Sequence, residues 1–127
     1  QKEEQVQEFF IDENTLEIQN PIHLKMSEPS EVSTRNKQTI YLDKDLLKFP
    51  LVLKKWSKGD YICLIGMKGS KKISKYFKDL KYSLLEKENI WLLYNANNDV
   101  IWIVSNRQDR RFAATNSTKN ILKISTI

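Results

Sequence analysis

The residues of this sequence that could carry out a specific chemical task are mainly lysines gathered in one short stretch. Six lysines and a single acidic residue, Asp79, lie between positions 68 and 81. Charges on an ordinary solvent-facing helix alternate in sign, so this excess of cations indicates a surface that binds a polyanion. A lysine-rich face that is only solvated has the same composition, and this alternative stays open.

A second basic cluster follows at Arg107, Arg110 and Arg111. The planar guanidinium group suits bidentate contact with phosphate better than the lysine ammonium does. Trp56, Trp91 and Trp102 lie in apolar runs, where packing in the core is expected rather than stacking on bases. The predicted phosphate-contacting residues are Lys68, Lys71, Lys72, Lys75, Lys78, Arg107 and Arg111.

Residues that could support catalysis or bind a metal are missing from the sequence. His23 is the only histidine, and no cysteine or acidic pair stands near it at the spacing of a metal site. Residues 66–71 (GMKGSK) resemble a P-loop, but Lys71 stands where that motif requires its second glycine. The same residues match the GxxG loop with which KH domains clamp a nucleotide backbone, although a strand, not a helix, is expected before them. The sequence predicts a non-catalytic chain without a metal or cofactor.

The positive charge is confined to one part of the chain. Residues 1–50 hold six basic and ten acidic residues, a net charge of −4, whereas residues 51–127 hold fifteen and six, a net charge of +9. A localised basic half is typical of proteins that bind nucleic acid, and a solvated basic surface gives the same count.

The bulk composition predicts one compact domain or two very small ones from 127 residues. No apolar run approaches the ~20 residues of a membrane helix, so no membrane partner is expected. The start of the chain, with Gln1, does not resemble a signal peptide, and we interpret the chain as a fragment of a longer protein. Cys63 is the one cysteine and is expected to be a reduced core thiol, which favours a cytoplasmic location.

The apolar pattern predicts an α+β fold, with a small, mainly antiparallel sheet and one or two short helices packed on it. A hairpin is expected at Gly59, between the strands at 51–56 and 61–66. A turn of helix is expected at Thr115. The other predicted strands cover residues 6–11, 15–19, 22–26, 38–43, 90–94 and 100–104, the last two as a hairpin, with a closing strand near 121–124.

A helix is predicted over residues 70–81 because its apolar residues recur at helical spacing. Ile73, Tyr76, Phe77 and Leu80 form one stripe. The opposite face carries Lys71, Lys75 and Lys78, and also Lys68 if the helix extends that far. Residues 69–70 offer a break and an N-cap, and a second short helix is expected over 83–87. The first turn then carries two lysines, which the helix dipole disfavours, and this conflict is expected where a polyanion binds.

The polar, aperiodic stretch at residues 27–37 is the best internal boundary. We predict amino-terminal strands and a linker over residues 1–37, and a carboxy-terminal binding domain over residues 38–127.

Four segments of the sequence are informative in their order and spacing: residues 53–60 (LKKWSKGD), residues 66–79 (GMKGSKKISKYFKD), residues 100–104 (VIWIV), and Arg111-Phe112 followed by Thr115 and Thr118. Together they resemble the carboxy-terminal domain of tRNA(Ile)-lysidine synthetases. The resemblance covers residues 40–127. One difference is the stretch Val104-Ser105-Asn106 before Arg107, where the family pattern leads us to expect a glycine.

The resemblance implies a function that the residues alone do not. Family members use ATP, with Mg²⁺, to adenylate the wobble cytidine of an isoleucine tRNA and then attach lysine to it. Their nucleotide site is an SGGxDS-type loop in an amino-terminal domain, and that motif is absent here. The resemblance therefore implies a part that helps to hold the acceptor stem, with tRNA and the enzyme's own catalytic domain as partners. The competing hypothesis is a protein-interaction or scaffold module without RNA contact.

Overall fold

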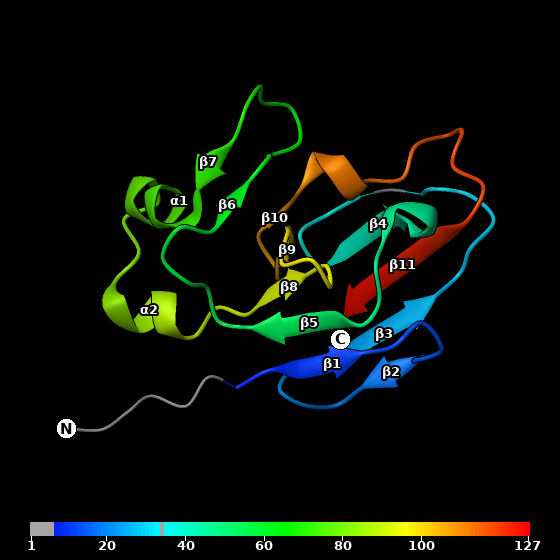
Figure 1. Cartoon of the computed structure of the whole chain (residues 1–127), viewed down its shortest axis with the longest axis horizontal. Coiled ribbons are helices and arrows are strands. Elements are labelled where there is room, and N and C mark those ends of the chain that lie inside the picture. The colour runs from blue at the N-terminus through cyan, green and yellow to red at the C-terminus, as the bar shows by residue number, and fades with distance from the viewer. Residues whose placement is uncertain (1–6, 34) are drawn as a thin grey trace.

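The computed structural model describes residues 7–33 and 35–127 and confirms the α+β class (Figure 1). Its strands form two larger sheets and one two-stranded ribbon, and the strand pairs are antiparallel throughout the described residues. In this part of the chain no helix has the length and apolar character needed to cross a membrane.

The five-stranded sheet lies in the middle of the molecule. Its strands, in spatial order, are β1 (Phe9–Ile11), β5 (Leu51–Lys54), β8 (Leu92–Tyr94), β9 (Val100–Ile103) and β10 (Arg107–Gln108). The predicted hairpin between residues 90–94 and 100–104 is confirmed as β8 and β9, where Leu93 pairs with Trp102. Asn98 takes a positive φ in the connecting turn, a conformation that asparagine tolerates better than most residues.

The four-stranded sheet joins the two ends of the chain. Its strands, in order, are β2 (Glu17–Ile18), β3 (Leu24–Ser27), β11 (Ile121–Thr126) and β4 (Thr39–Asp43), and a short 3-10 turn, η1 (Lys44–Leu46), follows β4. These strands confirm the ones expected near 15–19, 22–26, 38–43 and 121–124. The division of the chain at residue 37 stays a prediction. Strands from both sides of this position pair with each other, β1 with β5 and β3 with β11.

Side chains of β8 and β9 contribute to two separate hydrophobic clusters. Leu93 and Trp102 pack with the four-stranded sheet, whereas Leu92 and Ile103 pack against the helical side of the molecule. A sheet covered on both faces requires strands that are apolar throughout, which explains the continuous runs IWLLY and VIWIV. Trp102 is fully buried, and the other two tryptophans pack at the edges of the clusters, so their predicted core role is confirmed.

The second hydrophobic cluster is covered by a short ribbon and one helix, and a second helix with no buried residue follows in the chain. The ribbon consists of β6 (Tyr61–Ile62) and β7 (Lys71–Lys72), and the helices are α1 (Ile73–Asp79) and α2 (Leu84–Glu88). Ile73, Tyr76 and Phe77 are buried as predicted, but Leu80 follows the helix and is largely exposed. The α2 prediction is confirmed, and Ser83 and Glu86 form a reciprocal capping box at its start.

The hairpin predicted at Gly59 is wrong. Strand β5 already pairs with β1 on one side and β8 on the other, so it has no free edge for the strand that follows. The chain instead turns away at residues 57–60, where the Asp60 carboxylate accepts a hydrogen bond from the Ser57 amide. Strand β6 then pairs with β7, which makes the ribbon an outlying layer (Figure 1).

The predicted helix start is also wrong, because Lys71 and Lys72 are strand residues that pair with Ile62 and Tyr61. Helix α1 begins at Ile73, and its N-cap residue, Lys72, makes no side-chain capping bond. The strand pairing outweighs the helical periodicity of this segment. The predicted helical turn at Thr115 is replaced by a hydroxyl-bonded turn with Thr118, whereas a 3-10 turn, η2 (Arg110–Phe112), lies before it.

Candidate nucleic-acid interface

The predicted lysines do not form a single face, because three different pieces of backbone carry them. Lys68 lies at the tip of the loop between β6 and β7, and its side chain is exposed. Lys71 and Lys72 are neighbours in β7, where successive side chains point to opposite faces. Lys75 and Lys78 are exposed on α1.

Asp79 is the counterion of two of these lysines. Its carboxylate oxygens lie 2.5 Å from the Lys71 ammonium and 2.8 Å from the Lys75 ammonium. The hydrogen bond from Lys71 is the main cause that lowers the pKa of the Asp79 carboxyl to about 2, and the hydrogen bond from Lys75 is the second. Desolvation acts in the opposite direction and raises this pKa. The positive charge of the lysine cluster is therefore partly neutralised by Asp79. Within the described residues, no ion pair involves Lys68, Lys72 or Lys78.

Arg111 is held by an internal carboxylate. Its guanidinium donates to both oxygens of Asp109, with the Arg111 Nη2 atom 2.9 Å from Oδ2. The Asp109 side chain is completely buried, and it also accepts hydrogen bonds from the backbone amides of Cys63 and Arg111. Hydrogen bonding to Asp109 is the main cause of the raised pKa of Arg111. Much of this arginine's charge is thus neutralised inside the domain.

Arg107 occupies a different position, on strand β10. Its Nη2 atom donates to the carbonyl of Ile65 at 2.9 Å, and no carboxylate of the described residues pairs with it. The preceding turn contains Ser105 at a φ of 62°, a conformation that glycine adopts without cost. Ser105 thus takes a backbone conformation that the expected glycine would adopt without cost.

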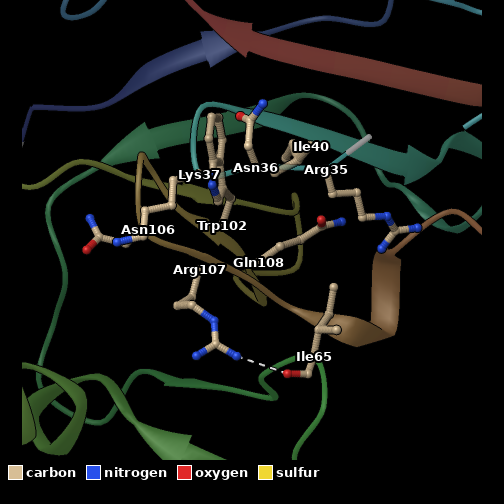
Figure 2. A pocket seen from close by; sticks show the side chains of 9 residues that line it. All are labelled: Arg35, Asn36, Lys37, Ile40, Ile65, Trp102, Asn106, Arg107 and Gln108. Atoms are coloured by element: carbon tan, nitrogen blue, oxygen red, sulfur yellow. Dashed lines mark hydrogen bonds between the residues drawn. The ribbon is translucent and has the colours of Figure 1, made fainter. Parts of the chain in front are cut away.

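Arg107 lines a hollow of about 290 Å³ on this side of the molecule. Figure 2 shows Arg35, Lys37 and Arg107 around the opening, with Trp102 and Ile40 also among its walls. Among residues 7–33 and 35–127 no carboxylate lines this hollow, which makes it a concentrated patch of positive charge. The remaining lining residues are Asn36, Ile65, Asn106 and Gln108.

Arg35 and Lys37 were missed by the sequence reasoning, which assigned residues 27–37 to a linker. The composition gives no clear signal for them, because the first half of the chain holds four other basic residues as well, Lys2, Lys25, Lys44 and Lys48. The guanidinium of Arg35 donates to the carbonyl of Ala114, so the segment is fastened to the carboxy-terminal part of the fold. What was predicted as a connection is also part of the basic surface.

The GxxG loop of residues 66–69 is open on its outer side. Gly66 and Gly69 have φ angles of 86° and 73°, and a Cβ atom at either position would meet no heavy atom within 4 Å. Arg110 anchors this loop by donating from Nη1 to the carbonyl of Gly69 at 2.9 Å. The loop presents Lys68 to solvent, but a strand precedes it and a strand follows it, so the arrangement is not that of a KH domain.

Two packed antiparallel sheets with a cation-bearing ribbon at one side define a small α+β domain with a basic surface. The chain matches the family model described as the TilS substrate C-terminal domain over residues 51–125, and it belongs to this family. The match confirms the resemblance found in the sequence.

Relatives and a solved structure agree with this membership. The chain is 48% identical over 88 residues to a tRNA(Ile)-lysidine synthase of Parabacteroides distasonis, covering 69% of this chain and 20% of that protein. It is 34% identical over 111 residues to the enzyme of the same name from Bacteroides thetaiotaomicron, covering 87% and 26%. A crystal structure of a TILS C-terminal domain superposes with a TM-score of 0.75 at 16% identity, over 95% of this chain and 98% of the other. The chain spans between a fifth and about a quarter of the length of these relatives.

Proposed function

We propose that this chain is the non-catalytic, tRNA-binding part of a tRNA(Ile)-lysidine synthase, and that it contacts the phosphate backbone of the acceptor stem. The observation that carries the proposal is a set of cations, on and beside the ribbon, that form no ion pair with any carboxylate of the described residues. These are Lys68, Lys72, Lys78 and Arg107, together with Arg35 and Lys37 at the hollow of Figure 2. Lys71, Lys75 and Arg111 contribute less, because each has a carboxylate partner in the domain.

Backbone contact is the mode of binding that suits these residues. Flexible lysines neutralise phosphates but carry no rigid geometry for reading base edges. Proteins recognise double-stranded RNA mostly by shape and by contacts to phosphates and 2′-hydroxyls. The domain would therefore add affinity and orientation to a tRNA, whereas the choice of nucleotide would lie elsewhere.

The ligation belongs to a part of the enzyme outside this chain. In this proposal an amino-terminal catalytic domain binds ATP with Mg²⁺, activates the wobble cytidine and attaches lysine, and the present domain holds the same tRNA at its acceptor end. The relatives bear the name tRNA(Ile)-lysidine synthase. A cytoplasmic location is part of this proposal.

The proposal is tested by the salt dependence of tRNA binding. A triple variant, Lys68→Gln, Lys72→Gln and Lys78→Gln, is compared with the wild-type chain by fluorescence anisotropy over a range of salt concentrations. Each lost phosphate contact lowers the slope of log affinity against log salt by about 0.9, so the slope should fall by about 2.7. Affinity at low salt should fall at least about tenfold.

A matched control uses exposed lysines remote from the ribbon. Lys25→Gln, Lys48→Gln and Lys119→Gln together remove the same charge and involve no ion pair among the described residues. The slope of log affinity against log salt for this variant should differ from the wild-type slope by less than about 0.9, the value for one phosphate contact. Wild-type affinity and an unchanged slope in the ribbon variant would exclude backbone binding by these lysines.

One observation favours a second candidate, the protein-interaction module. Leu84 and Leu85 on α2 are 69% and 68% exposed, and Leu80 beside them is 47% exposed. Exposed leucines on a short helix are typical of a surface that packs against another protein, here the enzyme's catalytic domain. If the ribbon variant binds tRNA as the wild type does, this candidate becomes the leading one.

A further inference from the structure

The outer face of the β6–β7 ribbon carries a second hollow, distinct from the one at Arg107. It has a volume of about 560 Å³ and lies between the ribbon and the η2 turn. Its lining residues are Gly59, Tyr61, Cys63, Gly69, Ser70, Lys72, Arg110 and Arg111. No carboxylate is among them, so the hollow is lined by cations, one aromatic ring and small polar groups.

Strand alternation explains how these residues meet. Tyr61 and Lys72 are direct partners in the ribbon, and their side chains lie on the same face. Ile62 points to the opposite face and is fully buried in the second hydrophobic cluster. The Lys71 side chain does not line the hollow, since its ammonium pairs with Asp79. The ribbon therefore has one core face and one face that presents Tyr61 beside Lys72.

The Tyr61 ring is held in place and remains accessible. The Arg111 guanidinium lies over it at 5.2 Å from the ring centroid, and Arg111 is itself fixed by the buried Asp109. Even so, the exposed fraction of Tyr61 is 40%, which is high for an aromatic residue within a paired ribbon. An exposed ring that is immobilised from one side loses little entropy when a second flat group stacks on it.

We propose that this hollow binds an unpaired nucleotide of the RNA, with the base stacked on Tyr61 and the adjoining phosphate at Lys72. The inference rests on the proposed function and adds a single-stranded component to it. Bases that are not paired stack on aromatic rings and arginine planes, and nearby lysines neutralise their phosphates. A duplex could not use the ring, because its bases are already stacked on one another.

The test compares two RNA hairpins of identical stem, one blunt and one with a single-stranded tail at its end. The wild-type chain should bind the tailed hairpin more tightly. Tyr61→Leu, which keeps an apolar side chain but no aromatic face, should lower affinity for the tailed hairpin by about 5- to 100-fold and leave the blunt hairpin unaffected. Tyr61→Phe should retain the preference, and Lys72→Gln should reduce the salt slope for the tailed RNA by about 0.7.

Phe10 offers a matched control, because it is another exposed aromatic residue, on β1, and is 62% exposed. Phe10→Leu should bind both hairpins as the wild type does, and thermal melting should show that all variants are folded. A Tyr61→Leu variant that keeps the preference for the tail, or loses affinity for both hairpins equally, would overturn the inference while the proposed function stands. Failure of the wild-type chain to bind either hairpin would overturn the proposed function itself.

Discussion

Replacing Asp109 with alanine should destabilise the domain by at least about 3 kcal/mol, since the individual costs belong to one hydrogen-bonded network and are not simply added. The variant removes the acceptor of the buried Cys63 amide, which costs about 1 to 3 kcal/mol, and the N-cap bond to the Arg111 amide, which is worth about 1 kcal/mol. It also leaves the Arg111 guanidinium without its partner. Breaking a fully buried pair costs about 3 to 5 kcal/mol, and the low end applies because the Arg111 side chain is 28% exposed and water can solvate it.

Urea denaturation followed by tryptophan fluorescence measures this loss, since Trp102 is fully buried in the core. Asp99→Ala is the matched control: its carboxylate lies 3.8 Å from Arg111 and is partly exposed, so its removal should cost below about 1 kcal/mol. If the free energy of unfolding of Asp109→Ala lies within about 1 kcal/mol of the wild-type value, the stabilising role assigned to the Asp109–Arg111 pair is refuted. A double-mutant cycle with Arg111→Ala should give a coupling of about 1 to 3 kcal/mol.

Two further predictions concern the helical side of the domain. The pKa of Asp79 is lowered to about 2, so its stabilising contribution is fully present above its ordinary range near 4 and is lost as the pH falls towards 2. A carboxyl titration by NMR should show this low pKa, and Lys71→Gln should raise it. Replacing Ser83 with alanine removes the capping box of α2 and should lower the unfolding free energy by about 1 kcal/mol, measured by denaturation, if α2 unfolds with the rest of the domain.

Local patterns were sufficient to predict many of the elements. Strand β9 consists of β-branched and aromatic residues, strand β8 is apolar throughout, and an asparagine-rich turn separates them, so their hairpin needs no distant information. The N-cap residue of helix α2 is a serine, and a glutamate follows it three residues later, which is a local signal as well. In both cases the residues that decide the structure lie within a few positions of one another.

Pairing between distant segments accounts for the errors. Nothing in two adjacent lysines predicts a strand, and β7 exists because the edge of β6 is available to it. In the same way, β5 could not form the predicted hairpin with β6, since β1 and β8 arrive from elsewhere in the chain and occupy both of its edges. These outcomes depend on which edges remain free after folding, and a periodicity argument does not contain that information.

The basic surface shows the functional consequence of the same limit. Read as one helix, residues 68–78 offer five lysines on or near a single face, and counterion release would then give a salt slope of about 4.5. In the structure Lys71 and Lys75 share Asp79, which leaves Lys68, Lys72 and Lys78 and a slope of about 2.7 from this segment. The compensating cations, Arg35 and Lys37, come from the acidic half of the chain and meet Arg107 only in the folded domain (Figure 2). The drop in slope when all five lysines are replaced therefore distinguishes a continuous lysine helix, about 4.5, from separate phosphate positions of which this segment supplies only three, about 2.7.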